Sequence, residues 1–201
     1  MLSVLARAIF LLAFAAGCAS QPRPCKMGAP NNCEYSCTVK GAPRSCTVHG
    51  VMLENGTSVA RDAKRANEFY LRGCVLGDAE GCHLGGLQMY LGKGVPPNRD
   101  FAARMFSAAC QLSLADGCAM LGAVRASVPG VPPLEVQEHL VRACRLGSGL
   151  GCLMLGQRTL TGNGVAKDPI EAKKLFHLAC VNGEPEGCKL EKDTAPVDST
   201  L

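Results

Sequence analysis

The chain has 201 residues, 13 of them cysteine and none tryptophan, and aromatic residues make up only 4%, so its core must consist mainly of smaller apolar side chains. The formal charge of +4 arises from 21 basic and 17 acidic residues without a basic block, so no nucleic-acid partner is expected. This cysteine content is typical of a disulfide scaffold, but complete pairing needs an even number. We therefore expect one cysteine with a separate role.

Residues 1–17, MLSVLARAIFLLAFAAG, predict a signal peptide. Arg7 is its only charge, and the apolar run that follows is shorter than the roughly 20 residues of a membrane-spanning helix. The end of this segment and the residue after it, Ala15-Ala16-Gly17-Cys18, resemble a bacterial lipobox, although leucine is usual at the first position. Lipidation of Cys18 leaves twelve cysteines for six bridges. The alternative is ordinary secretion with Cys18 as a free thiol.

The two residues after Cys18 bear on localisation. Ala19 and Ser20 differ from the aspartate that often retains lipoproteins at the inner membrane. We therefore expect a lipid anchor in the outer membrane of a bacterial envelope, on either the periplasmic or the surface face.

Residues 18–45 are interpreted as a lipidated N-terminal segment that contains a disulfide loop. Cys37 and Cys46 lie nine residues apart in two near-identical Ser-Cys-Thr-Val sequences, which predicts that they pair. Cys25 and Cys33 remain and are expected to close a small loop. A four-cysteine zinc site is the alternative, but the segment lacks the two C-x₂₋₄-C pairs of a zinc ribbon.

From Cys46 onward the cysteines recur with a period. Cys46, Cys82, Cys118, Cys152 and Cys188 are separated by 36, 36, 34 and 36 residues. A period of this length predicts a solenoid. The units are 46–81, 82–117, 118–151 and 152–187 within a repeat region of 46–188, and a polar, flexible tail is expected over 189–201.

Other features recur with the cysteines and predict two helices in each unit. A glycine lies four residues after the first cysteine, and glycines that can end a helix follow it. The second helix begins at a capping residue in three units and carries apolar residues on one face, at positions i, i+4, i+7 and i+8. No segment alternates like a β-strand, so an all-α array is expected.

The spacing of the cysteines also predicts how they pair. The second cysteine of each unit lies eight residues before the next unit's first, and a continuous helix over that distance would place them roughly 12 Å apart, too far for a disulfide. Turn residues lie between them, so the chain is expected to reverse there. The predicted pairs are Cys74–Cys82, Cys110–Cys118, Cys144–Cys152 and Cys180–Cys188.

Together these motifs resemble the Sel-1-like repeat, in its cysteine-rich bacterial Hcp-type branch, over about residues 37–190. The resemblance rests on A-C-x₇-C-x₃-G, G-x-G-V-x-x-D and A-x₃-F-x₃-C. It implies a TPR-like α/α superhelical solenoid, stapled by disulfides, in which the first helix of each pair lines a concave surface. The loop of the third unit, Ser127-Val-Pro-Gly-Val-Pro-Pro, lacks the first glycine and the aspartate.

The resemblance also implies an enzyme hypothesis, because members of this branch are described as penicillin-binding proteins or weak β-lactamases. However, no lysine has a serine three residues before it, as the S-x-x-K motif requires. The four histidines, His49, His83, His139 and His177, occupy different repeat positions. No catalytic residue, metal site or cofactor is therefore predicted.

The first helices carry polar residues that we expect on the concave surface: His83, Gln88, Arg125, Gln157 and Arg158. They could contact a peptide, another envelope protein or a peptidoglycan fragment, or they could merely be solvated. The main hypothesis is a monomeric lipoprotein scaffold that binds protein or peptide partners. The alternatives are an enzyme that binds or hydrolyses β-lactams and a mechanical spacer without a ligand.

Overall fold

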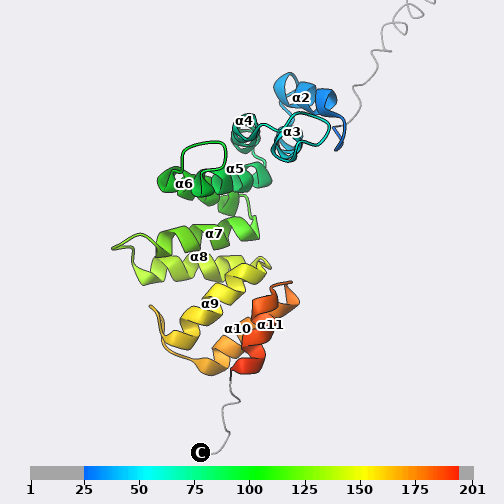
Figure 1. Ribbon diagram of the computed structural model, residues 1–201. Helices are drawn as coiled ribbons and strands as arrows, with labels where there is room; N and C mark the ends of the chain where they lie inside the picture. Colours follow the sequence, from blue (N-terminus) through cyan, green and yellow to red (C-terminus); the bar gives the residue numbers. More distant parts are fainter. Residues whose placement is uncertain (1–24, 195–201) are drawn as a thin grey trace, which may run out of the picture.

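The computed structural model describes residues 25–194, so the predicted signal peptide, Cys18 and residues 195–201 lie outside the described range. Over that range the protein is a curved stack of helices without strands, as predicted (Figure 1). None of these helices is long and apolar enough to cross a membrane. The helices are α2 (Pro30–Thr38), α3 (Pro43–Asn55), α4 (Ala63–Val75), α5 (Ala79–Leu91), α6 (Arg99–Gln111), α7 (Ala115–Ala126), α8 (Pro133–Arg145), α9 (Gly149–Thr161), α10 (Pro169–Val181) and α11 (Pro185–Asp193).

Each repeat contributes an antiparallel pair, α3 with α4, α5 with α6, α7 with α8 and α9 with α10, and α11 packs on α10. The helical array extends beyond the predicted limits at both ends. Helix α2 lies in the segment 18–45, for which a disulfide loop but no helix was predicted, and it packs on α3. The tail expected from residue 189 begins as helix, because α11 continues to Asp193 and Leu190 packs against the core around Phe176.

The glycine four residues after the first cysteine lets the two helices of a unit approach closely. A Cβ atom on Gly86 would lie 2.8 Å from the ring of Phe106, a distance that real Cβ contacts do not show. The other units repeat this contact, so the recurring glycine is explained by packing rather than by a turn. The pairs are Gly50–Tyr70, Gly86–Phe106, Gly122–Leu140 and Gly156–Phe176.

The helix ends follow the recurring cap residues. The side chains of Asp62, Asn98 and Asp168 each accept a hydrogen bond from a backbone N–H three residues later, which satisfies a donor that the helix leaves free. In the third unit, α8 instead starts after Pro132, with Pro133 in its first turn and no side-chain cap. Proline suits this position because its φ is helical and the missing N–H has no partner there.

Six disulfides join the twelve described cysteines, in the pairs expected from the spacing, and their Cα atoms lie 4.4–4.7 Å apart. Four of them connect the end of a second helix to the first turn of the next unit. Since all four N-terminal cysteines are in disulfides, they offer no thiolates, and the zinc alternative is wrong. The pairs are Cys25–Cys33, Cys37–Cys46, Cys74–Cys82, Cys110–Cys118, Cys144–Cys152 and Cys180–Cys188.

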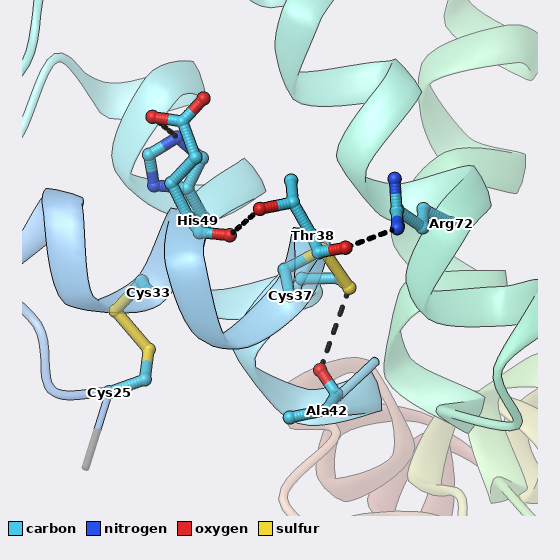
Figure 2. Close-up of a disulfide and its surroundings, with 9 residues drawn as sticks. Cys25, Cys33, Cys37, Thr38, Ala42, His49 and Arg72 are labelled. Atoms are coloured by element: carbon cyan, nitrogen blue, oxygen red, sulfur yellow. Dashed lines mark hydrogen bonds and ion pairs between the residues drawn. A yellow bond between two sulfur atoms is a disulfide. The ribbon is translucent and has the colours of Figure 1, made fainter. Parts of the chain in front are cut away.

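Helix α2 is fixed to the array by polar contacts as well as by a disulfide (Figure 2). The guanidinium of Arg72, from α4, donates to the Thr38 carbonyl at the end of α2, at 2.9 Å. Glu34 of α2 forms an ion pair with Arg65 at 3.1 Å and lies 3.9 Å from the buried ring of His49. Helix α2 therefore covers the start of the array, as a capping element does in a solenoid.

Candidate binding surface

The odd-numbered helices line the inner side of the curved array. Consecutive odd-numbered helices, α3 to α11, contact one another along the stack, whereas among the even-numbered ones only α4 and α6 come comparably close. In a curved stack the elements on the inside of the curve lie closer together. The first helix of each pair therefore faces the concave side, as the resemblance implied.

A hollow of about 360 Å³ lies on this side and crosses three consecutive first helices. We call it the groove. Its volume is within the range of ligand pockets, roughly 300–1,000 Å³. It is lined by His83 and Leu87 of α5, Asp116 and Met120 of α7, Gly149 and Leu150 of α9, and Asn182, Gly183 and Glu184 from the turn before α11.

The lining combines an apolar floor with polar groups at the rim. Leu87, Met120 and Leu150 are half-buried, whereas Asp116 is exposed. The hydroxyl of Ser148 donates to Asp116 at 2.7 Å and also accepts from the backbone N–H of Gly151 at 3.0 Å. Ser148 thus caps α9 and holds one carboxylate oxygen of Asp116 in place.

His83 contributes a half-buried ring to the groove. Burial lowers the pKa of His83 below its usual value, and the nearby carboxylates of Asp116 and Glu80 offset this only in part. The ring lies at a tilt to Phe106, with 5.8 Å between centroids, and Nδ1 is buried without a hydrogen-bond partner. At neutral pH the imidazole is therefore uncharged, and it adds no positive charge to the groove.

A second hollow, of about 230 Å³, lies where α7 and α9 end. It contains two of the predicted binding residues, Gln157 and Arg158, and the Arg158 guanidinium donates to the Pro133 carbonyl at 3.5 Å. The Nε of Arg158 is buried without a partner. The other lining residues are Ala126, Val136, Leu140, Met154, Thr161 and Asn163.

The structure therefore separates the five predicted binding residues. His83 lies in the groove, Gln157 and Arg158 lie in the second hollow, and Arg125 forms an ion pair with Glu135. Gln88 was expected on the concave surface, but this expectation is wrong, because the side chain is 2% exposed. The corresponding residues of two other units, Met52 and Val124, are also buried, so this repeat position belongs to the core in three units, whereas the fourth places the half-buried Arg158 there.

Sequence reasoning missed Asp116, Met120, Asn182 and Glu184. Asp116 lies two residues before Cys118, where other units place Glu80 and Glu186. An acidic residue is common in the first turn of a helix, so nothing in the sequence indicated that Asp116 also lines the groove. Asn182 and Glu184 lie in a disulfide-closed turn, and only the curvature of the array brings them beside α5 and α7.

The described residues do not gather into a reactive centre. Within 25–194, no three metal-ligating side chains cluster. In the same range the two serine hydroxyls that donate do so to a carbonyl and to Asp116, and no serine is hydrogen-bonded to a lysine or histidine. No observation favours β-lactam hydrolysis.

Comparisons with known proteins identify the repeat. The sequence profile of the Sel1 repeat matches residues 43–78, 82–114 and 149–183, just over half of the chain. The profile leaves residues 115–148 unmatched, and these residues contain most of the third unit with its shortened loop. No curated protein sequence gives a significant match.

Three solved structures of similar fold come from bacteria. A Sel1 repeat protein from Oxalobacter formigenes is 22% identical, with a TM-score of 0.72, over 82% of this chain and 67% of that one. A protective antigen of uropathogenic Escherichia coli with an SLR fold is 22% identical, with a TM-score of 0.73, over 85% and 38%. Helicobacter pylori cysteine-rich protein B is 29% identical, with a TM-score of 0.52, over 65% and 95%.

Proposed function

The chain belongs to the Sel1 repeat family, and we propose that it is a scaffold that binds an extended segment of a partner protein in the groove. The observation that carries this proposal is the groove itself, which crosses the first helices of three consecutive units. A solenoid presents such a continuous concave surface because each unit contributes the same face of its first helix.

The lining of the groove favours a peptide over a small polar ligand. Its floor offers the side chains of Leu87, Met120 and Leu150. Binding of a peptide would remove their apolar surface from contact with water, which is favourable. Its rim offers the Asn182 amide and two carboxylates, which can orient a backbone or a side chain. An apolar floor with a polar rim is the usual anatomy of a protein interface.

We further propose that the protein acts as a monomeric lipoprotein of a bacterial envelope, anchored at Cys18 in the outer membrane. Six disulfides support an oxidising compartment, because the bacterial cytosol keeps thiols reduced. The even pairing supports a separate role for Cys18, the thirteenth cysteine. The lipobox-like sequence before it supports lipidation in particular.

Site-specific photo-crosslinking in the native host tests the binding site. A photoreactive side chain at Met120, in the groove, is expected to capture one protein, whose crosslinked peptide identifies the bound segment. The control carries the same group at Leu134, which is 63% exposed on the outer helix α8. Capture from position 134 alone, or the same products from both positions, would contradict a binding site in the groove.

Metabolic labelling with an alkyne fatty acid tests the anchor. The mature protein is expected to incorporate the label and to fractionate with outer membranes, and Cys18→Ser is expected to abolish both. Labelling that persists in the Cys18→Ser variant, or its absence in the wild type, would exclude this lipid anchor. Size-exclusion chromatography with light scattering on the Cys18→Ser variant tests the oligomeric state. The molar mass of one chain is expected.

A further inference from the structure

The charged residues of the groove have one sign. Asp116 and Glu184 are both carboxylates, and no lysine or arginine is among the nine lining residues. This contrasts with the chain as a whole, whose formal charge is +4. The groove is thus a locally acidic hollow in a mildly basic protein.

Four other carboxylates in first turns of helices have cationic partners, whereas Asp100 in the first turn of α6 forms no ion pair with residues 25–194. Glu80 pairs with Arg44 at 3.3 Å, and Glu186 pairs with Lys189 at 3.7 Å. On the second helices, Glu135 pairs with Arg125 and Glu171 with Lys174. The helix dipole explains why acidic residues lie at these positions, and each of these four has a cation of the protein close by.

Asp116 and Glu184 differ from these carboxylates. Neither forms an ion pair with any residue between 25 and 194. Asp116 is oriented by the hydroxyl of Ser148, which is itself 2% exposed and fixed as the cap of α9. Glu184 is half-buried at the start of α11. Two carboxylates therefore border an apolar floor without a counter-charge from the protein.

We propose that the groove selects a segment of a partner protein in which a lysine or arginine lies next to apolar residues. The ammonium or guanidinium group donates charge-assisted hydrogen bonds to Asp116 and Glu184. Its methylene chain and the neighbouring apolar side chains cover Leu87, Met120 and Leu150. This inference rests on the proposed function, and it names the chemistry of the bound segment.

A displayed library of random 12-residue peptides, selected on the oxidised protein, tests the proposal. We expect the recovered peptides to be enriched in Lys or Arg flanked by Leu, Ile, Met or Phe. Asp116→Asn and Glu184→Gln, each of nearly unchanged shape, are expected to weaken their binding about tenfold, the effect of losing one charge-assisted hydrogen bond. Binding should also weaken as the salt concentration rises.

The matched control is Glu186→Gln, because Glu186 holds the same repeat position as Asp116 but lies outside the groove and pairs with Lys189. It is expected to leave peptide binding unchanged. A second variant, Met120→Asp, places a charge in the apolar floor between Leu87 and Leu150, and far-UV circular dichroism checks that each variant is folded.

The outcomes separate the two proposals. Peptides that lose affinity with Met120→Asp but not with Asp116→Asn or Glu184→Gln would overturn the cation preference and leave the groove as a peptide-binding site. Acidic or purely apolar peptides would do the same. Recovery of no peptide, or of peptides that Met120→Asp does not affect, would overturn the proposed function as well.

Discussion

Replacement of Gln88 by methionine is expected to stabilise the protein. Gln88 is 2% exposed in α5, and neither the amide nitrogen nor the amide oxygen has a hydrogen-bond partner. The same repeat position holds Met52 in the first unit and Val124 in the third, both buried. Methionine has a similar length to glutamine and no polar group to desolvate, so Gln88→Met removes a cost without opening a large cavity.

The magnitude follows from the unpaired amide. A buried polar group without a partner costs about 1–3 kcal/mol, so a gain of about 2 kcal/mol in the free energy of unfolding is expected. For a chain of this size that gain corresponds to a rise of about 4–8 °C in Tm. Thermal unfolding of the oxidised protein, followed by circular dichroism, measures it.

The reciprocal substitution serves as the control. Val124→Gln places an unpaired amide at the same repeat position of the third unit and is expected to lower the Tm by a similar amount. An unchanged or lower Tm for Gln88→Met would refute the reasoning, because it would mean that water or a neighbouring group satisfies the amide in solution.

Three further predictions concern stability. Gly86→Ala is expected to destabilise the protein by about 2 kcal/mol, because the added methyl group clashes with the Phe106 ring, and denaturant unfolding measures the loss. Replacement of both Cys74 and Cys82 by serine is expected to cost about 2.5 kcal/mol, the loop-closure entropy of a nine-residue ring, in the same assay. Burial lowers the pKa of His49 below its usual value, so the folded protein binds fewer protons than the unfolded chain, and stability should fall as the pH decreases below about 6.5.

Each of these predictions has a control. Glu138→Ala, on the exposed face of α8, should change the free energy of unfolding by less than about 0.5 kcal/mol. A loss for Gly86→Ala as small as that of this control would contradict the packing argument. Serine at Cys25 and Cys33 opens a ring of the same size next to α2 and should cost a similar amount, so a loss for one pair without the other would contradict the loop-closure argument. His49→Gln should reduce the dependence on pH without abolishing it, because burial also lowers the pKa of His83 and of His139, and an unaltered slope would assign the dependence to those groups.

The fold could be predicted because the repeat makes each signal appear several times. One glycine at the eighth residue of a helix says little, but four glycines in the same register marked the repeat, and the structure places each opposite a large apolar residue. The eight-residue spacing of the cysteines was also informative, because a continuous helix cannot close it. Polarity was less reliable: the glutamine at position 88 is buried like Met52 and Val124 in the same repeat position, whereas Arg158 in that position of the fourth unit lines the second hollow.

The binding surface was harder to predict because it is formed between units. Asp116 looks like an ordinary first-turn residue, and Glu184 lies 68 residues later in a turn. They border one groove only because the odd-numbered helices form the inner side of the curve. Helix α2 was missed for a different reason: it is only nine residues long and precedes the first full unit, so no repeat register marked it.

The disulfides and the glycine contacts stabilise different parts of the array. Gly86 and its equivalents bring together the two helices of one unit, whereas a bridge such as Cys110–Cys118 joins one unit to the next. The groove extends across α5, α7 and α9, so its shape depends on the junctions between units. A bridge acts mainly by restricting the unfolded chain and needs no apolar area. Covalent junctions thus fix the curvature of a protein with few aromatic residues, where a larger apolar interface between units would otherwise be needed, and they leave carboxylates free to border the groove.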